Sequence, residues 1–415
     1  MSKKECKESS SERDSTNDHE KIRMKIDETK EISSKSSNRN EVSLKTIETP
    51  KQLLSNGYQY IELIDEGTYG KIFSARKLKT GSMVAIKQID RMNSRIKSWL
   101  ENKCLDQEMK IMLSINHNNL IGALDVFKFR TIAFIVMPLV DGGNVKSLLL
   151  QRMKPFEEMQ ARRMFYDVVQ GLDYLHRNHI VHRDIKLENI LINENRLMLA
   201  DFGFAKFLRN EMNNFEQNLP NDSAFCYSPC GTVEYTSPEV NWIRISYLRE
   251  ESKSINQRYD AKSADIYSLG VCLYEILHLF KAFIRPEEIF VLDIATKLNL
   301  IYPRQMQMKL TKNPQVILST ECSNLLWRLL RPDPTKRPRS DEILSDVWLT
   351  PILSIEQRKL EKLKAINTLI QEYLLLENQE YTEKMRADKF QSYSLNRSAE
   401  NDKQIIKKQE KNNLE

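Results

Sequence analysis

The feature that most constrains this chain is a dense cluster of charged and amide side chains, His182-Arg183-Asp184-Ile185-Lys186-Leu187-Glu188-Asn189. The apolar run 190–192 follows it, and Asp201-Phe202-Gly203 comes twelve residues after Asn189. Asp201 and Asn189 offer the hard oxygen ligands that Mg²⁺ prefers. Asp184 offers an acceptor for a hydroxyl proton, and Lys186 offers a cation for a phosphoryl group. The cluster therefore predicts a site for a metal-bound phosphate.

A second signal lies upstream, between two segments with strand character. Gly67 and Gly70 would let the backbone bring its N–H groups close to phosphate oxygens. Seventeen residues after Gly70, the apolar segment 84–86 ends in Lys87, a cation for the α- and β-phosphates. Taken by themselves, the glycines could simply form a hairpin turn. Taken by itself, the lysine could be an ordinary solvated side chain. Their order along the chain favours a phosphate site.

In this order the motifs resemble those of the protein kinases, over about Tyr58 to Leu349. The resemblance implies an α+β fold of two lobes, with a small β-rich lobe before a larger helical one. The glycine loop departs from the family, because Asp65 replaces the first of three glycines. Asp tolerates left-handed backbone, so the turn is expected to survive, although the carboxylate should repel ATP.

For ATP, the resemblance implies contacts from the small lobe, from the connection between lobes and from two later segments. In that connection the carbonyl of Pro138 and the N–H of Val140 would bind adenine, since proline lacks only the N–H. Met137 would control access behind the adenine. The full expected set is Ile64, Gly67, Gly70, Ile72, Ala85, Lys87, Met137, Pro138, Val140, Asn144, Leu191 and Asp201.

A helix carboxylate is expected to hold Lys87 on the phosphates. Glu108 is favoured over Glu101, because the apolar residues that follow Glu108 then face the core at helical spacing. The resemblance assigns Mg²⁺ to Asn189 and Asp201. It assigns catalysis to Asp184, Lys186, Asn189, Lys87 and Glu108.

Lysine at position 186 resembles serine/threonine kinases and not tyrosine kinases. Thr232 supports this, since it matches a threonine that contacts the catalytic Asp and Lys. The motifs are most similar to the calcium/calmodulin-dependent group and, within it, to the testis-specific serine kinases. The alternative is a pseudokinase scaffold that binds nucleotide and partner proteins without turnover. Its mark would be the loss of a central residue, and all five central residues are present.

Substrate preference and control are also implied by the resemblance. Glu188 and Glu275 match acidic positions that attract basic residues upstream of the target hydroxyl, whereas Asn144 removes a third such position. Protein substrates with a moderate basic preference are therefore expected. Solvated surface carboxylates would explain Glu275 almost as well.

The segment from Asp201 to Glu239 is the expected activation segment. Arg183 implies a cation that would bind a phosphate group on this segment. Ser228 is the candidate phosphosite, with Tyr227 and Ser223 as alternatives. Proline at 229 is compatible with a proline-directed upstream activating kinase, and a turn-forming Ser-Pro explains it equally well.

The amino-acid composition along the chain predicts the domain boundaries. Residues 1–57 are rich in Ser, Lys, Glu and Asn and are expected to be a disordered extension. Residues 58–352 form the expected catalytic domain, and 353–415 a charged, partly helical tail. An apolar stripe that includes Leu360 and Leu363 fits a regulatory or calmodulin-type helix, but packing on the catalytic domain is favoured.

Other classes of protein are disfavoured. The 63 basic and 57 acidic residues are mixed, so no basic stripe for nucleic acid is expected. No stretch approaches 18 uninterrupted apolar residues, so no membrane span is expected. Six cysteines in so long a chain predict isolated thiols and no disulfide framework. The expected compartment is the cytoplasm, with nuclear entry left open.

Overall fold

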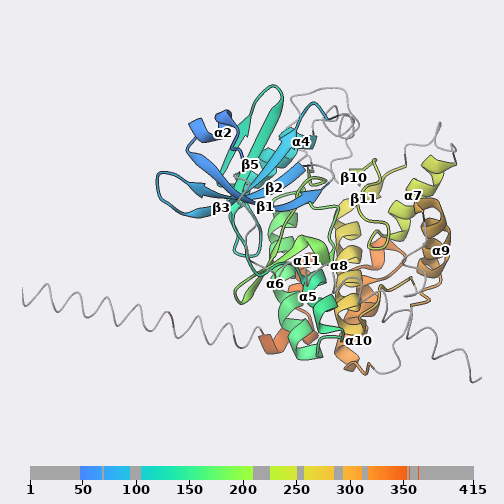
Figure 1. The fold of residues 1–415 in the computed structure, drawn as a ribbon. Coiled ribbons are helices and arrows are strands. Elements are labelled where there is room, and N and C mark those ends of the chain that lie inside the picture. The colour runs from blue at the N-terminus through green and yellow to red at the C-terminus, as the bar shows by residue number, and fades with distance from the viewer. Residues whose placement is uncertain are drawn as a thin grey trace, which may run out of the picture.

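The computed structural model describes residues 47–67, 70–93, 104–208, 225–249, 257–284, 293–310 and 316–352, together with residues 355 and 363. A small lobe built around a β-sheet lies against a larger lobe of helices (Figure 1). The predicted α+β class with two lobes is confirmed.

The small lobe contains a five-stranded antiparallel sheet with the strand order β1-β2-β3-β5-β4. Its central strand β3 buries Val84, Ala85 and Ile86, as expected of an apolar run covered on both faces. Helix α4 (Cys104–Ser114) lies beside the sheet and buries Met109, Ile111 and Met112 at helical spacing. The strands are β1 (Tyr58–Gly67), β2 (Gly70–Lys77), β3 (Met83–Asp90), β4 (Asp125–Lys128) and β5 (Ile132–Pro138).

Ordered structure begins before the predicted domain boundary at residue 58. Helix α2 (Lys51–Ser55) precedes β1, and its Leu53 is fully buried in one core cluster with Tyr58 and Phe134. The backbone N–H of Tyr60 also donates to the hydroxyl of Thr49 (2.9 Å). The prediction of disorder was therefore wrong for residues 47–57, because one leucine in a polar segment is enough to dock a short helix. Residues 1–46 lie outside the described part.

The large lobe is organised around α8 (Ala261–His278), which is buried on nearly all sides. Asp260 caps this helix by accepting from the backbone N–H groups of Lys262 and Ser263. The other helices are α5 (Val145–Arg152), α6 (Glu158–Arg177), α7 (Pro238–Leu248), α9 (Ile294–Met306), α10 (Thr320–Leu329) and α11 (Ser340–Leu344), with 3₁₀ turns η5 (Pro334–Lys336) and η6 (Val347–Leu349).

The described part of the segment 242–258 belongs to this lobe. Residues 242–248 continue α7, and the Trp242 ring stacks on Tyr302 of α9 with centroids 5.7 Å apart. Residues 250–256 lie outside the described part. Glu239 of α7 forms an ion pair with Arg337, through two contacts of 2.7 and 2.8 Å.

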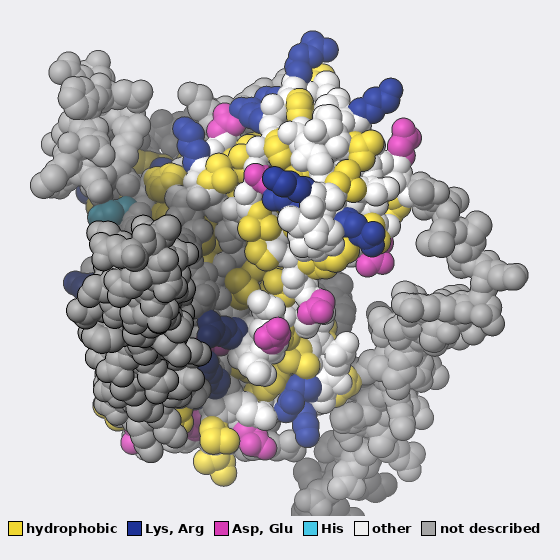
Figure 2. All heavy atoms as spheres, turned by 90° about the vertical axis from the view of Figure 1, so that its left-hand side faces the viewer, with side chains coloured by type: hydrophobic (Ala, Val, Ile, Leu, Met, Phe, Trp, Pro, Cys, Tyr) yellow, Lys and Arg dark blue, Asp and Glu magenta, His cyan; other side chains and the backbone are white. Residues whose placement is uncertain are grey.

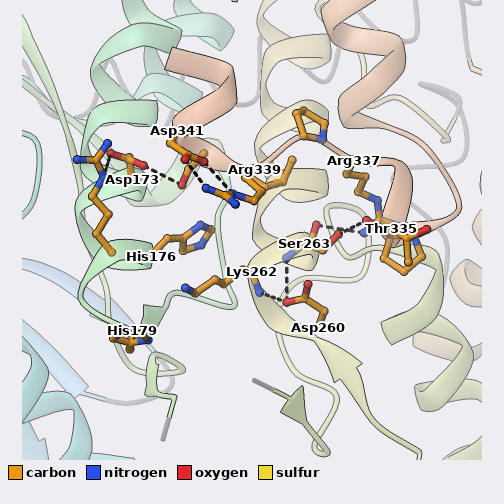
Figure 3. A pocket seen from close by; sticks show the side chains of 15 residues that line it. Asp173, His176, His179, Asp260, Lys262, Ser263, Thr335, Arg337, Arg339 and Asp341 are labelled. Atoms are coloured by element: carbon orange, nitrogen blue, oxygen red, sulfur yellow. Dashed lines mark hydrogen bonds and ion pairs between the residues drawn. The ribbon is translucent and has the colours of Figure 1, made fainter. Parts of the chain in front are cut away.

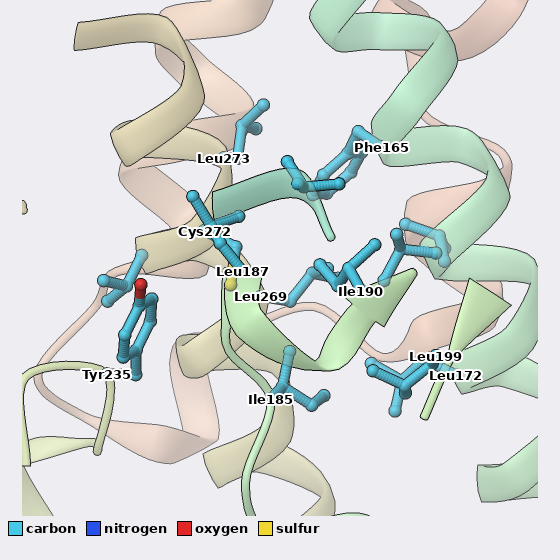
Figure 4. Close-up of a cluster of buried hydrophobic side chains, with 14 of the residues drawn as sticks. Phe165, Leu172, Ile185, Leu187, Ile190, Leu199, Tyr235, Leu269, Cys272 and Leu273 are labelled. Carbon is cyan, nitrogen blue, oxygen red and sulfur yellow. The ribbon is translucent and has the colours of Figure 1, made fainter. Parts of the chain in front are cut away.

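Short strands and a 3₁₀ turn lie between the lobes. Ile185 and Leu187, on either side of Lys186, point into the apolar core with Leu172, Leu199 and Leu269 (Figure 4). Apolar and polar residues alternate along this loop. Because Ile185 and Leu187 point into the core, the side chain of Lys186 between them points to the opposite side. The elements are β6 (Ile180–Val181), η2 (Leu187–Asn189), β7 (Ile190–Asn193), β8 (Arg196–Leu199), β9 (Lys206–Phe207), β10 (Phe225–Cys226) and β11 (Tyr259–Asp260).

On the face drawn in Figure 2, basic and acidic side chains are interspersed. Within the described ranges, no helix is both long enough and apolar enough to cross a membrane. Of the predicted C-terminal stripe, Leu363 is described: it lines a cavity of about 920 Å³ with the segment 115–124 and the β7–β8 turn. Leu360 lies outside the described residues.

Candidate active site

Three residues predicted from separate motifs meet in one ion-pair cluster. The Lys87 Nζ lies 2.6 Å from Glu108 Oε1 and 3.2 Å from Asp201 Oδ1. Strand β3 supplies the lysine, α4 supplies Glu108, and Asp201 follows β8. The Glu108 side chain is 1% exposed and that of Asp201 is 42% exposed, so the cluster opens on the side of Asp201. Glu101, the alternative to Glu108, lies outside the described residues.

The electrostatics of this cluster follow from burial and proximity. Burial disfavours the charge of Lys87, but the charges of Asp201 and Glu108 outweigh it and raise the pKa of Lys87 above its usual value. Lys87 in turn holds the pKa of Asp201 below its usual range. Burial raises the pKa of Glu108 against the attraction of Lys87. The lysine is therefore a permanent cation between two carboxyl groups.

The second cluster surrounds Asp184, which is buried. Its Oδ1 accepts from both the backbone N–H and the hydroxyl of Thr232, each at 3.0 Å. Its Oδ2 lies 2.8 Å from the Nζ of Lys186, which also donates to the Thr232 hydroxyl (3.1 Å). Asn189 Nδ2 donates to the Asp184 carbonyl (2.9 Å). The predicted contact of Thr232 with Asp184 and Lys186 is confirmed.

The two clusters are joined through the backbone. Ala200, the residue before Asp201, donates its N–H to the carbonyl of Asn189 (2.8 Å). His182 is fully buried, and its ring lies 5.1 Å from that of Phe202 in a tilted arrangement. Its Nε2 lies 3.1 Å from the carbonyl oxygen of Ala200. The residues of both motifs are thus held at fixed positions relative to each other.

Asp265 is a positioning residue that the sequence interpretation did not single out for this role. Its carboxylate accepts from the backbone N–H groups of His182 and Arg183, both at 2.8 Å, and is 3.2 Å from His176 Nε2. The signal in the sequence was an acidic residue inside the otherwise apolar stretch of α8. A buried carboxylate needs such partners, and here they are the turn before Asp184.

Strand register brings part of the predicted ATP-binding set together. Ala85 of β3 lies opposite Met137 of β5, and Val84 lies opposite Pro138. On the other lobe Asn144 forms an isolated bridge with Leu191, and its side chain caps α5 by accepting from the N–H of Ser147. Nearer the phosphate side, Ile72 lies opposite Lys87. Ile64 is half-exposed on β1, and Val140 follows β5.

The glycine loop joins β1 to β2 without left-handed backbone at position 65. Asp65 lies in strand β1 opposite Ile72 and does not adopt the left-handed conformation that its residue type would tolerate. Gly70 is packed so tightly that a Cβ would lie 2.3 Å from the carbonyl oxygen of Gln88. Packing alone therefore demands glycine at position 70. Gly67 ends β1, and residues 68 and 69 lie outside the described part.

The candidate phosphosite lies against a cation. The Arg183 guanidinium donates to both the carbonyl and the hydroxyl of Ser228, at 2.6 and 2.9 Å. Its Nε donates to the Tyr259 hydroxyl (3.0 Å). Ser228 is exposed and Tyr227 is half-buried, while Ser223 lies outside the described residues.

Glu275 is not a solvated surface carboxylate. Its side chain is 1% exposed and forms an ion pair with Lys146 of α5. Its other oxygen accepts from the hydroxyl of Tyr235 at 2.6 Å. The surface explanation of Glu275 was therefore wrong, and its partner Lys146 was not identified from the sequence.

A separate cavity of about 510 Å³ lies between the end of α6 and the starts of α8 and α11 (Figure 3). Several of its charged side chains pair with one another: Arg177 contacts Asp173 at 2.7 Å, and Ser340 donates to the same carboxylate at 3.0 Å. Arg339 pairs with Asp341 in the same way. The cavity contains none of the residues of the Lys87 and Asp184 clusters.

Comparison with known proteins agrees with this geometry. Residues 58–349 match the family model described as protein kinase domain. Testis-specific serine/threonine-protein kinase 3 of Mus musculus is 32% identical over 298 residues, covering 72% of this chain and 97% of the relative. NUAK family SNF1-like kinase 2 of Homo sapiens is 30% identical over 302 residues, covering 72% and 41%.

CBL-interacting protein kinase 16 of Oryza sativa subsp. japonica is likewise similar, 30% identical over 299 residues that cover 72% of this chain and 58% of the relative. These relatives and the family match confirm the predicted resemblance. The chain belongs to the protein kinase family and is a serine/threonine protein kinase related to the testis-specific and calcium/calmodulin-dependent kinases.

Proposed function

We propose that this kinase transfers the γ-phosphoryl group of Mg-ATP to serine or threonine hydroxyls of protein substrates, with Lys87, Glu108, Asp184, Asn189 and Asp201 as its central residues. The observation that supports this most is the ion-pair cluster of Lys87 with Glu108 and Asp201. It lies one backbone hydrogen bond away from the loop that carries Asp184 and Asn189.

The residues present fit a magnesium ion. Asp201 keeps a partly exposed carboxylate, and Asn189 uses its amide nitrogen toward Asp184, so its side-chain oxygen is the atom left for a cation. At Gly203 a Cβ would lie 3.3 Å from Asp201 Oδ1, so glycine keeps the surroundings of this carboxylate open. A hard oxygen donor set of this kind suits Mg²⁺. When bound, the ion neutralises charge on the phosphate oxygens.

Different side chains then position the nucleotide and the substrate. Lys87, kept cationic between two carboxyl groups, binds the α- and β-phosphates. Asp184 orients the substrate hydroxyl and accepts its proton, and Thr232 holds its Oδ1 in place. Lys186 stabilises the negative charge of the transferring phosphoryl group. The adenine is bound between Ala85 and Leu191, with the carbonyl of Pro138 and the N–H of Val140 as its hydrogen-bonding partners.

Control by phosphorylation is a further part of this proposal. The Arg183 guanidinium already contacts the Ser228 hydroxyl, and a phosphate on that oxygen would form charge-assisted hydrogen bonds with it. Ser228 is exposed and therefore accessible to an upstream kinase.

The test is phosphotransfer from radiolabelled Mg-ATP by the wild type and by Asp184→Asn, followed by phosphoamino-acid analysis. Wild type is expected to label serine or threonine, and Asp184→Asn to lower the rate by at least about 10²-fold, the contribution of a positioned acid–base group. Equal labelling by both proteins would assign the activity to a contaminant. Nucleotide binding without any labelling by the wild type would favour the pseudokinase scaffold.

A further inference from the structure

Lys146 lies in the first turn of α5 and forms an ion pair with Glu275 of α8, another helix of the large lobe. The lysine side chain is 22% exposed, whereas the glutamate is 1% exposed. Tyr235 completes the group by donating its hydroxyl to the second Glu275 oxygen. A fully buried carboxylate is thus neutralised by a cation that reaches it from the surface.

A second carboxylate belongs to the same region. Glu188 follows Asp184 by four residues, and its Oε2 is buried. Among the residues that the structure describes, no group donates to this oxygen. Burial raises the pKa of Tyr235, and the charges of Glu275 and Glu188 both add to this effect, so both carboxylates act on one hydroxyl. They likewise act together on the thiol of Cys272, which Figure 4 shows near Tyr235.

This acidic pair is next to the catalytic centre. The Tyr235 N–H donates to the carbonyl of Thr232 (3.0 Å), and Thr232 in turn holds Asp184. A polypeptide whose hydroxyl reaches Asp184 must therefore pass close to Glu188 and Glu275.

We infer that Lys146 fills, from within the chain, the position at which Glu188 and Glu275 would otherwise bind a basic side chain of the substrate, and that it thereby sets the substrate preference. The inference rests on the proposed function, because it concerns the protein substrate of that reaction.

The reason is charge balance. The charges of Glu188, Glu275 and Lys146 sum to about −1, and the buried Oε2 of Glu188 has no donor among the described residues. A substrate arginine then gains contact with a single carboxylate, that of the half-buried residue Glu188, and one such ion pair has a small effect. Without Lys146, the buried Glu275 would be an uncompensated charge, and an incoming guanidinium would be its best available partner.

The test uses serine peptides in which a single arginine is moved through the positions before the serine, with an all-alanine parent. For each peptide, kcat/KM is measured with Mg-ATP, and the Kd is measured without ATP by fluorescence anisotropy. Wild type is expected to prefer the best arginine peptide by no more than about threefold. Lys146→Met is expected to raise this preference about tenfold at one position, in both kcat/KM and Kd.

Matched variants separate this effect from others. Lys146→Arg keeps the cation and should retain the wild-type profile. Lys146→Gln removes the charge but can still donate to Glu275, so it should show the rise even if the methionine variant folds poorly. Lys336→Met removes an exposed lysine of the same lobe and controls for net charge. Adding Glu275→Gln to Lys146→Met should abolish the gain.

An unchanged arginine profile in Lys146→Met and Lys146→Gln would overturn the inference, as would an equal rise in Lys336→Met. The binding measurement keeps the outcome separate from the proposed function. A rise in arginine-peptide affinity without turnover would support the role of Lys146 while contradicting phosphotransfer.

Discussion

Asp65 stands beside the glycine loop as an exposed carboxylate in extended backbone. Replacing it by glycine is expected to lower the KM for ATP about two- to fivefold, because a screened repulsion at the surface is worth less than about 1 kcal/mol. Steady-state kinetics at low salt would measure this change.

Because the backbone at this position is not left-handed, the charge and not the conformation should matter. Asp65→Asn is therefore the matched variant and should lower the KM as much as Asp65→Gly. An unchanged or higher KM in both variants would show that this carboxylate does not act on the nucleotide.

At the same scale, the sequence predicted the site residues whose chemistry is tied to a motif. Glu108 followed from the apolar spacing after it, and Thr232 from the segment 230–235. Lys146 could not be found in this way, because a lysine in the first turn of a helix is ordinarily solvated. Its role depends on how close α5 lies to α8, which no local pattern encodes.

At the scale of secondary-structure elements, substitutions in α2 test where the folded domain begins. Leu53→Ala removes a fully buried side chain that packs with Tyr58, and is expected to lower the free energy of unfolding by about 2–4 kcal/mol. Leu54→Ala, at the neighbouring half-exposed position, should change it by less than about 0.5 kcal/mol.

Urea denaturation of both variants would measure the difference. Equal stabilities would mean that α2 does not contribute to the small lobe, and would restore the boundary predicted at residue 58.

The element type was well predicted for β3, whose apolar segment 84–86 has strand character. The start of the domain was not, since composition averages over a window and conceals one anchoring leucine among polar residues. Asp65 shows a similar limit: its residue type permits left-handed backbone, but pairing with β2 decided its conformation.

For the whole molecule, buried tyrosines predict a loss of stability at alkaline pH. Burial raises the pKa of Tyr60, Tyr235, Tyr259 and Tyr267 in the folded chain. A group with a raised folded pKa stabilises the fold below its unfolded pKa, about 10, and this contribution is lost as the pH rises further. The free energy of unfolding should therefore decline above about pH 10.

Each such tyrosine adds about 1.4 kcal/mol per pH unit to that decline. Tyr267→Phe keeps the ring stacked on Phe283 and removes one ionisable hydroxyl. Denaturant titrations between about pH 9 and 11 should show a shallower slope in this variant than in the wild type. Identical slopes would show that Tyr267 does not contribute to alkaline unfolding.

In the proposed function, side chains from both lobes meet around one metal-bound triphosphate. The most direct measurement is the affinity for ATP with and without Mg²⁺, by calorimetry, for the wild type, Asp201→Asn and Asp184→Asn. Mg²⁺ is expected to tighten binding about tenfold or more in the wild type and in Asp184→Asn, and to have little effect in Asp201→Asn. Two results would contradict this arrangement: an ATP affinity of the wild type that does not change with Mg²⁺, or an ATP affinity of Asp201→Asn that depends on Mg²⁺ as strongly as that of the wild type.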